Sequence, residues 1–173
     1  MNLELNRDVQ IVPARPSDES EFLDLVSASA ALHNGWVHPP HDPDAYARYL
    51  VRISKPNHRG FLARQVESGM LVGVVNVNDV VLGAFRSASL GYYGFASRGG
   101  NGHMTAAVGL AVSYAFSELR LHRIEANIQP GNGPSRALVQ RLGFRLEGLS
   151  PRYLYVSGDW RDHERWAVLS EEW

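Results

Sequence analysis

The sequence predicts an α+β fold formed by one domain over residues 1–173. Apolar residues recur at helical spacing up to about residue 55, and the pattern then changes to segments rich in β-branched and aromatic residues. A helical period returns after residue 103 for about four turns. No internal repeat, linker or low-complexity segment divides the chain. We therefore expect helices and strands to share one folding unit.

The composition narrows the classes of partner and chemistry. Hydrophobic residues make up 45% and charged residues 20% of the chain, with a formal net charge of −1, so no nucleic-acid or membrane partner is indicated. The chain has no cysteine, which excludes disulfides, thiolate metal sites and thiol nucleophiles. No secretory signal pattern and no apolar run of about 18 residues is present, so we expect a cytoplasmic location.

The N-terminal part is predicted to form a strand and two helices. The strand covers Val9 to Ala14, and Ser17 is a candidate cap for the first helix. The segment HNGWVHPPHDP then breaks the helical pattern, and Pro56 ends the second helix. The two faces expected to be buried carry Phe22, Leu25, Val26 and Ser29 in the first helix and Tyr46, Tyr49, Leu50 and Ile53 in the second.

From Arg59 onward we expect three antiparallel strands, in RGFLARQVE, GMLVGVVNVND and VVLGAFRSASLGYYGFA, with turns at Gly69 and Asn78–Asp79. A long helix follows the glycine-rich stretch, and residues 123–129 form another strand. A short helix begins at Asn132 or Gly133 and ends at Gly143. The segments RLEGL, RYLYVSG and ERWAVLS are predicted to be the closing strands.

Three glycines, Gly99, Gly100 and Gly102, lie directly before the long helix. A glycine-rich turn at a helix N-terminus exposes N–H groups and the positive end of the helix dipole, which together suit a phosphate. A Walker loop would need Lys-Ser/Thr where His103–Met104 stand, and a Rossmann unit would need a βαβ context. The pyrophosphate of coenzyme A remains, beside the alternative of a hairpin turn that binds nothing.

Further motifs follow the glycines in a fixed order. They are Asn132-x-x-Ser135, then Arg141-Leu142-Gly143-Phe144 with RLEG, and the tail YLYVSGDWRDHERWAV. With this series the chain resembles the GNAT N-acetyltransferase superfamily, and within it the RimJ/RimL-type ribosomal-protein-alanine acetyltransferases, over nearly its whole length. The resemblance implies a central mixed, mostly antiparallel sheet flanked by helices. It also implies an enzyme that uses acetyl-CoA and allows a homodimer.

The resemblance assigns the loop at Gly100–Gly102 to the pyrophosphate, and main-chain N–H groups around Phe95 to Ser97 to the oxyanion. Ser97 stands where the family usually has Gln or Arg, and Arg98 lies one position late. Asn132 would hold the pantetheine arm or only cap its helix. The residues predicted to bind the cofactor are Phe95, Ala96, Ser97, Arg98, Gly99, Gly100, Asn101, Gly102, His103, Met104, Asn132, Ser135 and Arg141.

Ser135 is the predicted catalytic proton donor, because Val139 occupies the position at which many family members carry tyrosine. The family's glutamate base is replaced by Ser89. A lysine amine is only about 0.04% neutral at pH 7, whereas more than about 10% of an α-amine is neutral. The lack of an evident base therefore favours an α-amine, unless a histidine or Glu147 acts through water.

By the same resemblance, the segment ALHNGWVHPPHDP would line the acceptor site, with a surface loop of scattered histidines as the alternative. The residues predicted to bind the acceptor are Trp36, His33, Ser89 and Tyr92. Asp159, Asp162 and His163 are expected to serve strand pairing, so we predict no metal site.

The resulting hypothesis is an N-acetyltransferase that moves acetyl from acetyl-CoA to a primary amine, in particular a protein N-terminal α-amine, by direct attack in a ternary complex. One alternative is a non-catalytic acyl-CoA-binding sensor, supported by Ser89 and Val139. The other is an acetyltransferase of a small-molecule amine or antibiotic.

Overall fold

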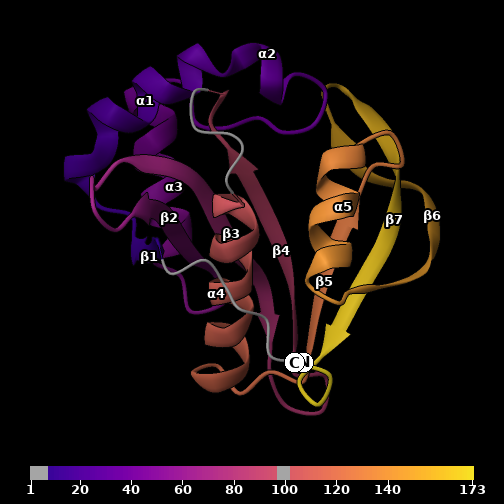
Figure 1. Cartoon of the computed structure of the whole chain (residues 1–173). Helices are drawn as coiled ribbons and strands as arrows, with labels where there is room; N and C mark the ends of the chain where they lie inside the picture. Colours follow the sequence, from indigo (N-terminus) through magenta and orange to yellow (C-terminus); the bar gives the residue numbers. More distant parts are fainter. Residues whose placement is uncertain (1–7, 97–101) are drawn as a thin grey trace.

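The computed structural model describes residues 8–96 and 102–173. A seven-stranded sheet runs through the molecule, and helices lie on both of its faces (Figure 1). The strands are β1 (Val9–Pro13), β2 (Arg59–Gln65), β3 (Leu71–Val81), β4 (Ser87–Gly94), β5 (Arg123–Ile128), β6 (Arg145–Val156) and β7 (Asp159–Leu169). The helices are η1 (Pro16–Asp18), α1 (Glu19–Ala28), α2 (Ala30–His33), α3 (Pro43–Ile53), α4 (His103–Ser117) and α5 (Gly133–Arg141).

The sheet order is β1-β2-β3-β4-β5-β7-β6, and every neighbouring pair is antiparallel except β4 and β5. The parallel pair requires a crossover, which α4 supplies between the two strands. The predicted α+β fold with a mixed, mostly antiparallel sheet is therefore confirmed.

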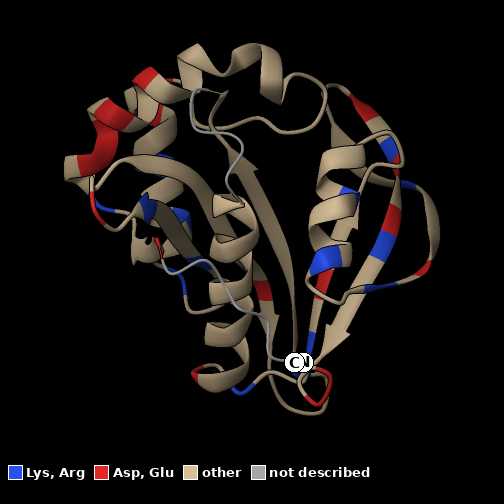
Figure 2. Ribbon diagram, in the orientation of Figure 1, with Lys and Arg blue, Asp and Glu red and all other residues tan. Residues whose placement is uncertain are grey.

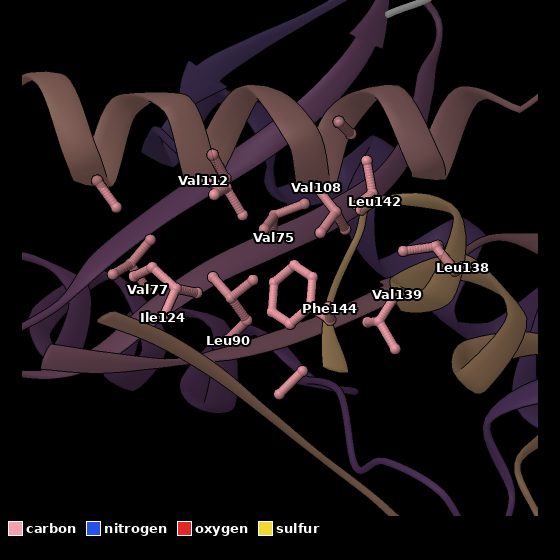
Figure 3. Packing of buried hydrophobic residues seen from close by; sticks show 14 of the residues in the cluster. Val75, Val77, Leu90, Val108, Val112, Ile124, Leu138, Val139, Leu142 and Phe144 are labelled. Atoms are coloured by element: carbon pink, nitrogen blue, oxygen red, sulfur yellow. The ribbon is translucent and has the colours of Figure 1, made fainter. Parts of the chain in front are cut away.

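Alternation along the central strands builds a core on each face of the sheet. On β3, Val75 and Val77 point to the face that α4 and α5 cover, where they pack with Val108 and Val112 of α4 (Figure 3). Val74, which precedes Val75 and points to the opposite face, belongs to the second core, under α1 and α3. Both faces of the central strands are buried, so these strands form nearly continuous apolar runs rather than half-polar ones.

An ion-pair network fixes α1 to the sheet. The Arg64 guanidinium on β2 donates to Asp18 Oδ1 and to Glu21 Oε2, each at 2.8 Å. Glu21 Oε1 also accepts from the Leu71 N–H at 3.2 Å. Asp18, rather than the predicted Ser17, is the residue before α1, because Ser17 lies inside the short turn η1.

Two predicted boundaries are wrong. The turn expected at Asn78–Asp79 is a register shift inside β3, where Asp79 has a φ of 53° and the strand goes on to Val81. The predicted strands RLEGL and RYLYVSG form one strand, β6, which keeps pairing with β7 through two irregularities. In both places a bulge absorbs the residues that suggested a turn.

Helix α4 carries no charged residue along its length (Figure 2), and it lies against β1, β2 and β3. Its N-terminus is seated by Met104, whose side chain packs on Gly73 and Gly94. A Cβ at Gly73 would lie 2.2 Å from Met104 Sδ and 2.7 Å from the Tyr93 carbonyl oxygen. These glycines therefore let the helix start close against β3 and β4. No helix in the described ranges is long and apolar enough to cross a membrane.

This close approach makes Gly73→Ala a test of how α4 is seated. Met104 can move, but the Tyr93 carbonyl belongs to a paired strand and cannot. We expect a loss of about 1–3 kcal/mol in the free energy of unfolding, measured by denaturant titration. Gly133→Ala is the matched control, since nothing lies within 4 Å of a Cβ there. Equal stability of the two variants would contradict the proposed seat.

Candidate active site

A cleft opens where β4 and β5 stop pairing. The parallel ladder runs from Ser87 opposite Arg123 to Leu90 opposite Ala126, although both strands continue beyond that pair. The two strands diverge upward between α4 and α5 (Figure 1). A cavity of about 370 Å³ fills the space between them. Its lining includes the ends of both strands, Met104 of α4, and Asn132, Pro134 and Ser135 at the start of α5.

The N-terminus of α4 reaches this cleft. Gly102 precedes the helix with a φ of 71°, no side chain caps the helix, and its first turn contains no acidic residue. The His103 side chain is buried, while Met104 lines the cleft. The other predicted members of the glycine loop, Ser97, Arg98, Gly99, Gly100 and Asn101, lie outside the described residues.

Two of the main-chain N–H groups predicted as donors already have hydrogen-bond partners. The Phe95 N–H is used by the Val72 carbonyl at 3.2 Å, and the Ala96 N–H by Ser29 Oγ at 3.0 Å. Because N–H groups alternate along an antiparallel ladder, those of Tyr92 and Gly94 point away from β3, toward the side where β5 has diverged. Of the predicted donors, the N–H groups of Phe95 and Ala96 are therefore already paired, and Ser97 lies outside the described residues.

Two hydroxyl groups meet inside the cleft. Tyr92, on β4, and Ser135, in the first turn of α5, place their hydroxyl oxygens 2.6 Å apart. Asn132 fixes this end of α5 because its Oδ1 accepts from the Ser135 N–H at 3.2 Å. Capping by Asn132, which the sequence offered as an alternative, is thus present, and the same residue also lines the cleft.

The surroundings of Tyr92 keep its hydroxyl protonated. Burial raises the pKa of Tyr92 to about 12, and the hydrogen bond with Ser135 offsets only part of this shift. Val139, at the position where a family tyrosine was expected, is fully buried in the core instead. The cleft therefore receives its phenol from β4 rather than from α5.

A second cavity, of about 1140 Å³, lies beside the first. One of its walls comes from α3 and β3, with Arg48, Tyr49, Arg52, Asn76 and Asn78. The other comes from α1, from α2 with His33, and from the segment after α2 with His38 and His41. The two cavities share His33, Val37, Gly91, Tyr92 and Tyr93, so they meet over the middle of β4.

His33 is held at this junction. Its Nε2 lies 2.8 Å from the Gly94 carbonyl oxygen, and its ring packs edge-on against Tyr93. A carbonyl oxygen only accepts hydrogen bonds, so Nε2 is the donor in this contact. Nδ1 is buried and has no partner among the described residues. His33 therefore braces the open edge of β4 against α2.

The segment after α2 crosses the mouth of the cleft. Gln129 Nε2, beyond β5, donates to the Gly35 carbonyl at 3.0 Å. Trp36 is 41% exposed and lines the first cavity, with Cη2 3.3 Å from where a Cβ on Gly131 would lie. The two sides of the cleft are thus joined across its open end.

Other predicted residues lie elsewhere. Ser89 pairs with Asn78 and Glu125 in the sheet and lines neither cavity. Arg141 is exposed at the end of α5, also outside both linings. Glu147 is bound by Arg123 and Arg145, and its hydrogen bonds to Arg123 hold its pKa below the usual range. It lines neither cavity, so its suggested role as a base through water has no support.

The sequence reasoning missed several cavity residues. Asn76 and Asn78 interrupt the apolar run of β3 after Val75, and that interruption was an available signal. His163 is buried and lines the first cavity, with Nδ1 2.9 Å from the Arg161 carbonyl oxygen. Asp162 Oδ1 accepts from the Arg152 N–H at 2.8 Å within the β6–β7 hairpin. The described residues contain no cluster suited to a metal ion.

The first cavity has the features that coenzyme A requires. The uncapped start of α4 offers N–H groups to an anionic end, and the parted strands offer unpaired backbone groups to the amide-containing arm. No carboxylate belongs to the described lining, so nothing there would repel a phosphate.

Comparison with known proteins agrees with this geometry. A family model described as an acetyltransferase (GNAT) domain matches residues 8–145. YjcK of Bacillus subtilis, described as a probable N-acetyltransferase, is 36% identical over 124 residues, which are 72% of this chain and 68% of that protein. The ribosomal protein uS5-alanine N-acetyltransferase of Escherichia coli is 39% identical over 103 residues, 60% of this chain and 53% of the enzyme, about half of its length.

The solved structure of Mycobacterium smegmatis RimJ in complex with CoA-disulfide matches this fold with a TM-score of 0.87 and 33% identity, covering 95% of this chain and 83% of that one. The chain therefore belongs to the GNAT acetyltransferases, acyltransferases that take their acetyl group from acetyl-CoA.

Proposed function

We propose that this protein acetylates the α-amino group at the N-terminus of a protein, by direct attack of the amine within a ternary complex. The observation that carries the proposal is the second cavity. It is wide, it opens onto the cofactor cleft at Gly91–Tyr93, and its described lining contains no carboxylate. The related E. coli enzyme acts on the alanine of ribosomal protein uS5, which supports a protein acceptor.

The missing carboxylate bears on the type of amine. A lysine side chain, with a pKa near ~10.4, needs a base to lose its proton at neutral pH, whereas an α-amine with a pKa near ~7.8 is partly neutral without help. Amino sugars or polyamines, which carry several ammonium groups, would find no carboxylate in the described lining to pair with. An α-amine therefore suits this cavity best.

Acetyl-CoA supplies an acetyl group activated as a thioester. In our proposal the N-terminus of α4, together with Asn132, binds this substrate in the first cavity. The N–H groups of Tyr92 and Gly94 face the opening between the strands and serve as donors to the oxygen that gains charge. The chain supplies these groups from paired, rigid elements, so they need little reorganisation.

The hydroxyl pair connects the two cavities. Overall, the acceptor nitrogen must lose a proton and the departing sulfur must gain one. Tyr92 lines both cavities, whereas Ser135 lines only the first. Tyr92 therefore takes the proton of the acceptor nitrogen as it passes its own proton to Ser135 Oγ across the 2.6 Å contact, and Ser135 passes its proton to the sulfur. With a pKa of about 12, Tyr92 takes part as a relay and does not release a proton by itself.

The activity is tested with purified protein, acetyl-CoA and peptides that begin with alanine or serine, read by intact mass. We expect a gain of one acetyl group at the N-terminus, because the cavity suits a weakly basic amine. A peptide with a blocked N-terminus and a free lysine is the control. Acetylation of the lysine alone, or of spermidine but no peptide, would contradict the proposed acceptor.

Removing either hydroxyl tests the relay. We expect Ser135→Ala and Tyr92→Phe each to lower kcat roughly 100-fold, with little change in the KM for acetyl-CoA. The double variant should be no slower than the slower single variant, because the two groups act as a unit. Tyr155→Phe, at an exposed tyrosine on β6, is the control. Unchanged turnover in Ser135→Ala would remove this residue from the mechanism.

The pKa of Tyr92 makes a further prediction about pH. The amine must be neutral, so kcat/KM should rise as pH increases through about 8. Tyr92 must keep its proton, and a pKa of about 12 means that it does so throughout the usable range. The profile should therefore reach a plateau by about pH 9 and stay flat to about pH 10. A descending limb between these values in stable protein would indicate a different proton donor.

A further inference from the structure

The wall of the second cavity formed by α3 and β3 is unusually rich in hydrogen-bond donors. Arg48 and Arg52 lie one turn apart on α3, and both line the cavity with exposed side chains. Arg48 has no hydrogen-bond or ion-pair partner among the described residues. Arg52 donates to Asn78 Oδ1 at 2.5 Å, which directs its guanidinium along the cavity wall.

The bond from Arg52 also decides the orientation of Asn78. A guanidinium can only donate, so the Asn78 carbonyl oxygen must face Arg52 and the amide nitrogen must face away from it. That nitrogen, Nδ2, lies 3.2 Å from where a Cβ on Gly91 would be. Gly91 belongs to both cavities. A row of donors thus leads from the junction of the cavities to Arg52 and Arg48.

No acid on the described wall neutralises these arginines. Asp44, one turn before Arg48, forms no ion pair with it. The Asp42 carboxylate accepts from the Ala45 N–H at 2.7 Å and lies 3.3 Å from His41 Nε2. The other titratable groups of the described lining are three histidines and three tyrosines, and the lining contains no carboxylate. The cavity therefore offers positive charge and donors to whatever enters it.

We propose that the acceptor carries a carboxylate close to its amine, and that Arg48 and Arg52 bind this group. This inference rests on the proposed function and narrows its substrate class. A guanidinium binds a carboxylate through paired N–H donors, and an extended chain advances about 3.3–3.6 Å per residue. With the amine at the junction, an acidic side chain at the second or third residue reaches the arginines. Polyamines, by contrast, are repelled.

The test measures binding, so that it does not depend on turnover. Fluorescence anisotropy compares C-terminally labelled peptides that begin alanine-aspartate-glutamate, alanine-glutamine-glutamine and alanine-lysine-lysine, with CoA present. We expect the acidic peptide to bind about tenfold more tightly than the glutamine peptide, and the lysine peptide to bind most weakly. The advantage should shrink when salt is raised from about 50 to about 300 mM.

Variants assign the effect to the arginines. Arg48→Gln combined with Arg52→Gln should remove the preference for the acidic peptide, while Arg52→Lys should retain part of it because the charge remains. Arg120→Gln, an exposed arginine in the loop after α4 and outside both cavities, should leave the preference intact. Equal affinity for all three peptides, no detectable binding of any of them, or a preference that survives the double variant would overturn the proposal.

Two further measurements distinguish a free amino acid from an acidic peptide, and failure of this inference from failure of the proposed function. Free alanine and aspartate, at about 10 mM, are added as competitors. Displacement that depends on Arg48 and Arg52 would support the carboxylate site and assign it to a free amino acid, whereas no displacement would support an acidic peptide. Acetylation of all peptides at equal kcat/KM would preserve the proposed function and refute this inference. Arginine-dependent binding without acetylation would do the reverse.

Discussion

The active site depends on a single interruption in the sheet, where β4 and β5 stop pairing after Leu90 and Ala126. Backbone groups inside a sheet must be satisfied, so a gap between two central strands is stable only when something else occupies or braces it. His33 satisfies the Gly94 carbonyl from one side, and α5 brings Ser135 to Tyr92 from the other. In the proposed mechanism, the N–H groups of Tyr92 and Gly94 are the ones that serve the bound substrate.

Helix α4 is held beside the gap by close apolar contacts rather than by charge. Met104 rests on Gly73 and Gly94, and the uncharged α4 buries its apolar surface against the sheet. This arrangement leaves the first turn of α4 without acidic side chains or a side-chain cap at the edge of the cleft. The same packing that stabilises the fold thus also places donors where a negatively charged ligand would bind.

Periodicity predicted most of the elements, because helical and strand patterns are local properties of the chain. It placed α1, α3, α4, α5 and the three strands of the meander, but it missed α2 and put a turn at Asn78–Asp79, where β3 continues. It could not place the Tyr92–Ser135 contact, since these residues are 43 positions apart and meet only through the crossover. The sequence also could not show that the predicted donors, the main-chain N–H groups of Phe95 and Ala96, are already paired. Whether a given N–H is free depends on strand register and on Ser29, which a single sequence does not reveal.

The segment that follows α2 serves two walls at once. Val37 in this segment and His33 at the end of α2 line both cavities, while Gly35 and Trp36 contact the turn beyond β5. A ligand that moves residues 34–37 in one cavity must also change the shape of the other cavity. By thermodynamic linkage this effect is mutual. The factor by which one substrate changes the affinity for the second equals the factor by which the second changes the affinity for the first. The residues that the two cavities share thus couple the two binding equilibria.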